Sequence, residues 1–528
     1  MMGHKKLQVW LPLLFSLVLI FGMFLGYKLA GGKGLLKTSR QNTLDKVLEL
    51  VRLKYVDKVN TDSLQSNAIQ DIMAHLDPHS VYFPPVELKE ANEDLAGNFD
   101  GIGVEFNIFR DTVHIMYVVP EGPSDKAGLK IGDRILAVND STLTRHGINS
   151  DQIKQFMRGE RGSLASLDIL RDGRQIKVDV ARGSIPVSSI DASYMMNDSI
   201  GYIKLNKFTQ NSYEEFMQAL EGLKKQGLKR LIYDLRGNGG GFMNEAFDMA
   251  DEFLKDDRLV VYTEGANSPK EEYFCKRPGL FEDGKLVILI DELSASASEV
   301  LAGALQDWDR AIIVGRRSFG KGLVQLQYPL GDGSAIRLTT ARYYTPLGRS
   351  IQRPYDKGKK VYMDELWERY NNGEVLYEDS NKVSNGKIYV TPGGDTLYGA
   401  GGIMPDVFVP IDTSSYPAAI NRLFLQGAVN NFVYRYYLQH RGRIDQIESL
   451  SQFDKAFSGD NGMWNEFATY LRNDSIPVVA VSESTRLSLQ RRMAGYLARF
   501  RWRNTGYFKL YNQEDPMVLE ALRIVRER

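Results

Sequence analysis

The sequence has a single cysteine, Cys275, so no disulfide can form within the chain. A zinc site built from cysteines is excluded for the same reason. Its six histidines are scattered, and no two of them have the HExxH spacing that places metal ligands on one helix face. We therefore predict no metal centre, and we expect no cofactor.

Excess charge of either sign is also absent, because lysine plus arginine and aspartate plus glutamate each number 66. A general nucleic-acid binder carries a basic surplus, so we predict no nucleic-acid partner. Hydrophobic residues make up 43% and charged residues 25%, which is typical of a folded chain rather than a disordered one. At roughly 150 residues per domain, the length indicates about three or four domains.

One long hydrophobic run is present, and it lies near the start of the chain. Residues 9–27 form an uncharged stretch of nineteen residues, close to the roughly 20 that cross a bilayer as a helix. This length favours an uncleaved anchor at 9–29 over a signal peptide, whose apolar region has about 7–15 residues. Lys5 and Lys6 favour a cytoplasmic N-terminus, residues 1–8. We expect the remainder to be extracytoplasmic, on the periplasmic face of a bacterial inner membrane.

Regular patterns divide the next part of the chain. Residues 38–95 are predicted to be helical, because apolar residues recur every three or four positions. Residues 96–186 contain short alternating runs separated by turn residues, which is typical of strands. Between 187 and 412 strands alternate with helices, and this predicts a mainly parallel sheet with crossover helices. The polar segment 353–397 is predicted to be an insertion in that region.

The last part of the chain, residues 413–528, is predicted to be mostly helical. One of its helices is rich in arginine, which could indicate a nucleic-acid surface. A solvated helix face explains the pattern better, given the balanced charge of the whole chain.

Ser296 is the first candidate for chemistry, because it lies between an apolar strand, 287–291, and a helix. Open α/β sheets bind ligands at this end of their strands. The helix N-terminus also favours a developing negative charge. The alternative is structural: Ser296 and Glu299 match the S-x-x-E capping box that begins many helices.

A serine nucleophile needs a base, and no histidine occurs between His146 and His440. A histidine base would have to come from a neighbouring domain, whereas Ser–Lys variants of the catalytic triad use a lysine. Lys321 lies between glycines in an apolar stretch, and burial would lower its pKa and free the amine as a base. If Lys321 starts a strand, Gln325 projects from the same face and can orient the amine. A surface lysine in a glycine turn is the alternative.

Two glycine-rich segments resemble nucleotide-binding motifs only in part. Residues 315–321 match the G-x-x-x-x-G-K opening of a P-loop, but Gly322 follows where Ser or Thr is required. Residues 234–241, DLRGNGGG, lack the spacing of a dinucleotide fingerprint. Their backbone N–H groups could instead form an oxyanion hole with that of Ala297, although a plain tight turn is the alternative.

Taken in order, these segments resemble one family, the carboxyl-terminal processing or tail-specific proteases, which are Ser–Lys endopeptidases carrying a PDZ domain. The resemblance covers about residues 40–410 and does not reach the C-terminal helices. Seven segments carry it: GIGVEF (101–106), GPSDKAGLKIGDRILAVND (122–140), DLRGNGGG (234–241), SASASEVLAGALQD (294–307), VGRRSFGKGLVQ (314–325), TTARYYTPLGRSIQ (339–352) and GIMPDV (402–407).

The resemblance implies a role for each candidate residue. Ser296 would be the nucleophile and Lys321 its general base, with Gln325 positioning the lysine. The family's oxyanion donors would correspond to the N–H groups of Ala297 and Gly240.

Neighbouring residues leave alternatives at these positions. The extra glycines leave Gly239 or Gly241 open as the second oxyanion donor, and Ser294 and Ser298 are the nearest alternatives for the nucleophile. Asp307 also matches a family motif, but it lies 11 residues beyond Ser296, about 16 Å up the helix, so we expect it to support packing.

The resemblance also implies the fold: a multi-domain α/β protein with a β-barrel-like PDZ domain at 96–186. An α/β protease core with crotonase-like ββα units would follow at 187–412, and the N- and C-terminal regions would be helical. In the PDZ domain, backbone amides would bind a peptide's terminal carboxylate while the peptide adds as a strand. The residues implied in peptide binding are Gly101, Ile102, Gly103 and Val104.

The function that follows is an extracytoplasmic serine endopeptidase that recognises protein C-termini through its PDZ domain and processes or degrades the chains. Its expected partners are proteins or peptides with free, apolar C-termini, the membrane, and an activator protein or further copies of the chain. The alternative from another class is a catalytically silent PDZ scaffold on the same fold. A ligand-binding protein of that fold is a third possibility, because fold alone does not determine function.

Overall fold

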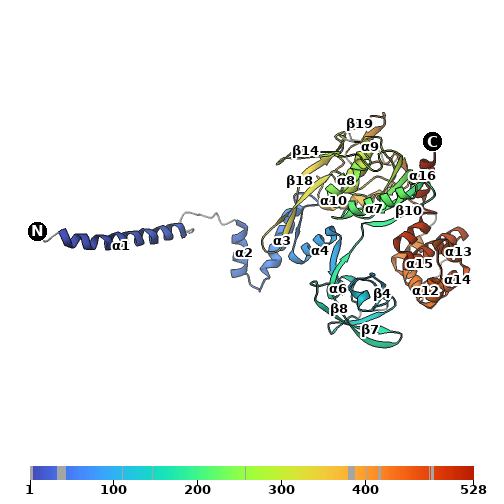
Figure 1. The fold of residues 1–528 in the computed structure, drawn as a ribbon, viewed down its shortest axis with the longest axis horizontal. Coiled ribbons are helices and arrows are strands. Elements are labelled where there is room, and N and C mark those ends of the chain that lie inside the picture. The colour runs from blue at the N-terminus through green and yellow to red at the C-terminus, as the bar shows by residue number, and fades with distance from the viewer. Residues whose placement is uncertain are drawn as a thin grey trace. The chain divides into compact units, whose positions relative to one another are not determined.

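The computed structural model describes residues 4–31, 43–109, 111–144, 147–255, 257–378, 387–399, 401–413, 418–474, 476 and 481–527. Contacts divide the chain into two compact units, Met1–Met73 and Ala74–Arg528. Figure 1 shows the elements of both units with their labels. Residues 38–42 of the predicted helical region and residues 379–386 of the predicted insertion lie outside the described residues.

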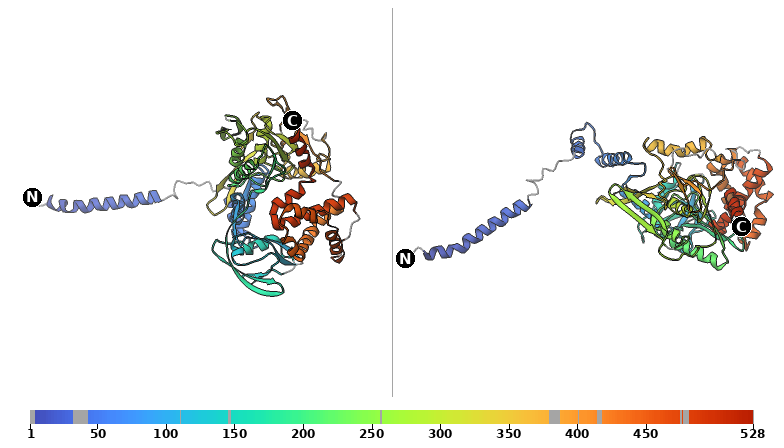
Figure 2. Two further views of the ribbon diagram at one scale, coloured as in Figure 1. Left: turned by 45° about the vertical axis from the view of Figure 1, so that its right-hand side comes forward. Right: turned by 90° about the horizontal axis from the view of Figure 1, so that it is seen from above.

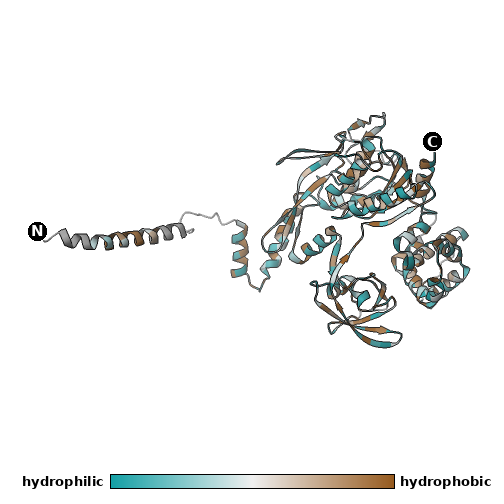
Figure 3. Ribbon diagram, in the orientation of Figure 1, coloured by the Kyte–Doolittle hydropathy of each residue, from teal (hydrophilic) through white to brown (hydrophobic). Residues whose placement is uncertain are grey.

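The first unit is helical. Its helices are α1 (His4–Gly31), α2 (Thr43–Lys54) and α3 (Thr61–Ala74, whose last residue belongs to the second unit). Hydrophilic and hydrophobic residues alternate along α2, in agreement with the apolar stripe expected there (Figure 3). The membrane span predicted at 9–29 lies within α1. Among the described residues, no helix combines the length and the apolarity needed to cross a membrane.

The segment before the strand-rich region is not wholly helical as predicted. Helix α4 (Pro85–Ala96) is present, but Val81–Phe83 forms a short strand, β1. It pairs antiparallel with β18 (Ala335–Tyr344), far along the chain. A segment of three residues is too short to show a strand periodicity in the sequence. Its pairing with a distant strand is determined by the tertiary structure.

Residues 98–186 fold around a small antiparallel sheet in the order β3-β4-β5-β7-β8, with β6 beside β5. Its core is formed by alternate, fully buried residues such as Val113, Ile115 and Ile135. Helix α6 is capped by Asn149, whose side chain accepts the N–H of Gln152. The elements are β2 (Asn98–Gly101), β3 (Val104–Phe109), β4 (Thr112–Val118), α5 (Pro123–Lys126), β5 (Arg134–Val138), β6 (Ser141–Thr142), α6 (Ser150–Met157), β7 (Leu164–Arg171), β8 (Arg174–Ala181) and β9 (Gly183–Pro186).

A second six-stranded sheet forms the centre of the following region, in the order β10-β11-β12-β15-β16-β21. The five strands from β11 onward are parallel, as the alternation of strands and helices predicts, and β10 is antiparallel. All five carboxyl ends therefore meet at one edge. The elements are β10 (Ile190–Met195), β11 (Ile200–Leu205), α7 (Ser212–Lys225), β12 (Arg230–Asp234), α8 (Met243–Asp251), β15 (Lys285–Ile290), α9 (Ala297–Asp307), β16 (Ile312–Gly315) and β21 (Val407–Phe408).

Both faces of this sheet are buried, which explains why a strand such as β15 is continuously apolar. Residues of α7, α8 and α9 form the core on one face, and α16 (Pro516–Arg526) packs on the other. A third sheet, β1-β18-β13-β14 with β17 beside β18, contains β13 (Leu259–Gly265), β14 (Ser268–Phe274) and β17 (Leu323–Pro329).

The polar segment predicted as an insertion contains helix α10 (Lys359–Asn371) and the hairpin of β19 (Ile388–Val390) and β20 (Thr396–Tyr398). Beyond it the chain is helical, with α11 (Ala418–Leu425), α12 (Ala428–Asp445), α13 (Leu450–Phe457), α14 (Asn461–Asn473), α15 (Glu483–Tyr511) and α16. Helices α11–α15 share one hydrophobic core and lie together as orange and red ribbons in Figure 2, and α15 also contacts β10.

The arginines of α15 are largely used within the protein. Arg499 and Arg503 form ion pairs with Glu105 on β3, and Arg491 pairs with Glu514. These contacts neutralise part of the positive charge of this helix, which the sequence analysis had placed in solvent.

Candidate active site

Ser296 occupies a strained turn between β15 and α9. Its backbone angles are φ 56° and ψ −113°, a region that residues with a side chain rarely adopt. Such strain persists only where the surroundings enforce it, and it is frequent at functional sites. The flanking Ser294 and Ser298 are fully buried, and their hydroxyls donate to the carbonyls of Leu235 and Asn238. Of the three serines, only Ser296 is partly exposed.

The buried carboxylate of Glu299 joins this turn to the loop that carries Lys321. It accepts hydrogen bonds from the backbone N–H groups of Ser296 (2.9 Å), Lys321 (2.8 Å) and Gly320 (2.7 Å), and from the Ser318 hydroxyl. Burial raises the pKa of Glu299, although these four bonds act in the opposite direction. The bond from Ser296 is half of the capping box expected from the sequence, so one contact serves both the helix end and the site.

Lys321 lies two residues before β17, which begins at Leu323 rather than at the lysine. Its Nζ nevertheless donates to Oε1 of Gln325 at 3.0 Å, the contact expected from the spacing. Burial, and next the nearby charge of Arg337, lower the pKa of Lys321. A neutral amine, the form required of a general base, is therefore more accessible here than in an exposed lysine.

Gln325 is itself held from a distant part of the sequence. Its Nε2 donates to the carbonyl oxygen of His79. The turn around His79 is closed by Asp77, whose Oδ1 accepts the N–H groups of His79 and Ser80, each at 2.8 Å. The residues D-P-H-S match an Asx turn in the sequence, but such a local pattern does not indicate that the turn supports Gln325.

His79 also lies near the lysine. Burial, and next the charge of Lys321, lower its pKa to about 3, so the ring is neutral at ordinary pH and a weak proton acceptor. Its Nε2 lies 2.9 Å from the hydroxyl of Tyr362 on α10. Its contribution to the lysine is made by its backbone carbonyl.

The glycine-rich loop after β12 passes directly beside the serine turn. A Cβ atom on Gly240 would lie 2.8 Å from Cβ of Ser296 and 2.9 Å from the nitrogen of Ala297, so only glycine fits. The N–H of Gly240 donates to Oδ1 of Asn238 at 2.9 Å. The structure thus brings together the two predicted oxyanion donors, and it shows that one of them is engaged by a side chain.

Family comparisons agree with this arrangement. The model of peptidase family S41 matches residues 199–358, and the PDZ domain model matches residues 101–181. A third model, described only as a family of unknown function, matches residues 419–503.

The relatives are named for one activity. The chain is 34% identical over 315 residues to the carboxy-terminal processing protease CtpB of Bacillus subtilis, which covers 59% of this chain and 65% of the relative, slightly less than two thirds. It is 33% identical over 340 residues to the carboxy-terminal-processing protease of Bartonella bacilliformis, covering 63% and 77%. The chain belongs to the carboxy-terminal processing protease family. The predicted family is confirmed, as is a PDZ domain combined with an α/β peptidase core.

One solved structure, titled photosystem II D1 C-terminal processing protease, has 26% sequence identity to the chain and a TM-score of 0.35. The alignment covers 71% of this chain and 88% of that one.

In this family member the insertion supports the lysine loop. Arg369 of α10 is 1% exposed, and its guanidinium donates to the carbonyls of Ser318 (2.8 Å) and Phe319 (3.3 Å). Arg317 pairs with Glu374 at 2.7 Å. These contacts hold the segment before Lys321, a role that the polar sequence of the insertion did not indicate.

The predicted peptide-binding residues lead from the end of β2, at Gly101, into β3, an edge strand of the PDZ sheet. Strand β3, which begins at Val104, pairs with β4 only, so its other edge has no strand partner among the described residues. Gly103 has φ +77°, which favours glycine. Ile102 is 2% exposed and belongs to the domain core, so its side chain does not line an open site; Val104 is half-buried.

Asp307 lies away from the serine, as expected. It is fully buried and forms an ion pair with Arg349, also fully buried, at 2.5 Å. Its Oδ2 also accepts the N–H of Leu347. Among the described residues, no three His, Cys, Asp or Glu side chains are grouped so that they could hold a metal ion.

Proposed function

We propose that this family member is an active Ser–Lys endopeptidase that cleaves proteins whose C-termini its PDZ domain has bound. The observation that carries the proposal is the link between Ser296 and Lys321. One buried carboxylate, Glu299, binds the backbone of both residues, and the lysine amine is oriented by Gln325. A decayed scaffold has no reason to retain a buried lysine with a lowered pKa beside a strained serine.

The proposed reaction begins with transfer of the Ser296 hydroxyl proton to the neutral amine of Lys321. The serine oxygen attacks the scissile carbonyl, and the ammonium then protonates the leaving amine. Water hydrolyses the acyl-enzyme, with the regenerated amine as its base. Gln325 keeps the amine in line for both proton transfers.

We assign the first oxyanion contact to the N–H of Ala297, at the N-terminus of α9. The second donor comes from the glycine-rich loop. In the described conformation Asn238 accepts the N–H of Gly240, so this N–H becomes a donor only after it leaves Asn238; Gly239 and Gly241 stay as alternatives.

Substrate capture is assigned to the PDZ domain. A peptide tail can add to the open edge of β3, with its terminal carboxylate at the backbone amides of residues 101–104. We also propose an extracytoplasmic location, for which the uncharged run at 9–27 and the preceding lysines are the support. Protease treatment of spheroplasts tests the location, and light scattering of the purified chain tests the expected self-association.

The deciding experiment incubates the full chain with an unfolded protein that ends in apolar residues, beside Ser296→Ala. Cleavage by the parent alone supports the peptidase and its nucleophile together. Tail binding by both proteins without cleavage by either supports the silent scaffold instead. A matched control is Ser188→Ala, which replaces an exposed serine remote from the turn in sequence.

A further inference from the structure

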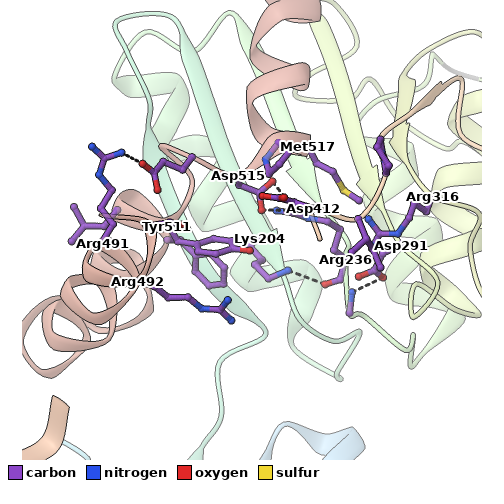
Figure 4. A pocket seen from close by; sticks show the side chains of 18 of the residues that line it. Lys204, Arg236, Asp291, Arg316, Asp412, Arg491, Arg492, Tyr511, Asp515 and Met517 are labelled. Carbon is purple, nitrogen blue, oxygen red and sulfur yellow. Dashed lines mark hydrogen bonds and ion pairs between the residues drawn. The ribbon is translucent and has the colours of Figure 1, made fainter. Parts of the chain in front are cut away.

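Arg236 lies in the glycine-rich loop, four residues before Gly240, and its guanidinium is held from two sides. Nη1 donates to both carboxylate oxygens of Asp515 at 2.9 Å. Nη2 donates to Asp234, at the end of β12, at 2.6 Å. Figure 4 shows Asp515 reaching the loop from the start of α16. The partners Arg236 and Asp515 are separated by 279 residues in the sequence.

The backbone that follows Arg236 is tied at successive residues. Its carbonyl accepts Nζ of Lys204 at 2.8 Å, and the N–H of Gly237 donates to Asp291 at 2.9 Å. The carbonyl of Asn238 then accepts the N–H of Ala295 at 3.0 Å, which belongs to the serine turn. A displacement of Arg236 would therefore be transmitted along the loop to the oxyanion side of Ser296.

The outer side of this loop faces a cavity of about 600 Å³. The cavity lies between the carboxyl ends of the parallel strands and helices α15 and α16, and Arg236, Gly237 and Asp515 are among the residues that line it (Figure 4). On that side the loop is held by the ion pairs and hydrogen bonds of Arg236 and Gly237. Among the described residues, the ion pair with Asp515 is the only one of these contacts that comes from the C-terminal helices.

Asp515 itself has a firm position that does not depend on the loop. It is 5% exposed and caps α16, accepting the N–H of Val518 at 3.0 Å. Apolar residues of α16, including Met517 and Ala521, pack against the sheet. A buried ion pair adds little net stability, because desolvation offsets its attraction. Packing therefore accounts for the docking of α16, and the ion pair with Arg236 is free to serve another purpose.

We propose that Asp515 is a positioning residue of the active site, which holds the glycine-rich loop beside the Ser296 turn through Arg236. The proposal rests on the proposed function, because the loop supplies the second oxyanion donor in that mechanism. It gives the C-terminal helices, to which the family comparison assigns no role, a part in catalysis. The peptidase core alone would be incomplete without α16.

Two substitutions separate this role from helix capping. Asp515→Asn and Asp515→Ser both keep a good N-cap, so α16 should remain docked. Asn loses the charge and one acceptor for Arg236, and Ser is too short to reach it. We expect kcat to fall about tenfold in Asp515→Asn and further in Asp515→Ser, because a misplaced oxyanion donor costs up to about 10²–10³-fold. KM and binding of the tail peptide should not change.

The matched control is Glu520→Gln, which removes a carboxylate of the same helix that pairs with the exposed Arg523. It should leave kcat and the thermal midpoint unchanged. A double-mutant cycle with Arg236→Gln adds a second check, since Asp515→Asn should have no further effect on kcat in that background. Full additivity would show that Asp515 does not act through Arg236.

Hydrogen exchange of residues 236–241, followed by mass spectrometry, tests the same idea without any activity. Exchange should be faster in Asp515→Ser than in the parent and Glu520→Gln. If the parent cleaves and Ser296→Ala does not, unchanged kcat in both Asp515 variants overturns the positioning role alone. If the parent never cleaves, the proposed function fails, and unchanged loop exchange then overturns this inference separately.

Discussion

The carboxylate of Glu299 accepts the backbone N–H of Lys321 at 2.8 Å, although the two residues lie 22 positions apart. The same carboxylate oxygen, Oε2 of Glu299, also accepts the backbone N–H of Ser296 at 2.9 Å. The proposed nucleophile and its proposed base are thus positioned through their backbones by one buried group.

Replacing Glu299 with glutamine should damage both stability and catalysis. An amide retains one acceptor oxygen and turns an NH₂ group towards backbone N–H donors, so at least one donor is left unsatisfied. Each buried N–H donor that is left without an acceptor lowers the free energy of unfolding by about 1–3 kcal/mol. We expect Glu299→Gln to lower the free energy of unfolding by at least that amount and to lower kcat per folded molecule. Denaturant titration and active-site titration measure the two effects.

Lys321→Ala should reduce kcat by about 10²–10⁴-fold, the usual contribution of a positioned general base. In the parent, kcat should rise with pH through the pKa of Lys321, which burial places below the ordinary lysine value of 10.5. Steady-state kinetics between pH 6 and about 10 measure this limb. A pH-independent parent rate, or an active Lys321→Ala variant, would contradict the assignment.

The same buried lysine makes a prediction about stability. Because its pKa is lower in the folded chain, the unfolded chain binds this proton more tightly, and stability should rise with pH between the lowered pKa and 10.5. Below that range the charged amine destabilises the fold. Lys321→Met should therefore raise the thermal midpoint near pH 7, and the gain should shrink towards pH 10. Calorimetry of the parent and Lys321→Met near pH 7 and pH 10 measures the thermal midpoints. An equal rise in the midpoint at both pH values would contradict the lowered pKa of Lys321.

The contact between α10 and the lysine loop predicts that Arg369→Gln impairs the enzyme from outside the catalytic residues. Losing the guanidinium leaves the carbonyls of residues 317–319 without this donor, whereas Glu374 keeps its ion pair with Arg317. We expect a loss of about 1–3 kcal/mol in the free energy of unfolding, the cost of an unsatisfied buried polar group, and a lower kcat with unchanged KM. Lys360→Gln, on the exposed side of the same helix, is the control and should behave as the parent.

Blocking the substrate's terminal carboxylate as an amide should slow cleavage, with most of the effect in KM. The reason is that the proposed PDZ contact binds the charged terminus through backbone N–H groups. Paired substrates that differ only at this group, assayed at equal concentration, provide the measurement. Equal rates would remove residues 101–104 from substrate selection.

Several features of the fold followed from sequence patterns of short range. The apolar run of β15 and the serine turn after it are separated by a few residues, and the lysine–glutamine pair by four. At such spacings the geometry of strands and helices nearly determines which side chains meet. The parallel sheet followed from the alternation of strands with helices for the same reason.

Other features had no local signal. The strand at Val81–Phe83 was predicted to be helical, since only its pairing with β18 makes it a strand. The insertion gave no sign that Arg369 would cap the lysine loop. The support of Gln325 by His79 spans 246 residues, and the sequence contains nothing that links the two.

The sequence alone therefore determined which residues could carry the chemistry, because Ser296, Lys321 and Gln325 are defined by their motifs and by the elements on which they lie. Only the tertiary structure decided how they are held. In the folded chain the carboxylate of Glu299 binds the backbone N–H groups of both Ser296 and Lys321. The N–H of Gly240 is bound by Asn238, and Asp515 pairs with Arg236. The physical reason is that local periodicity encodes helices and strands, whereas partners far apart in the chain meet only when the packing of the whole core brings their elements together.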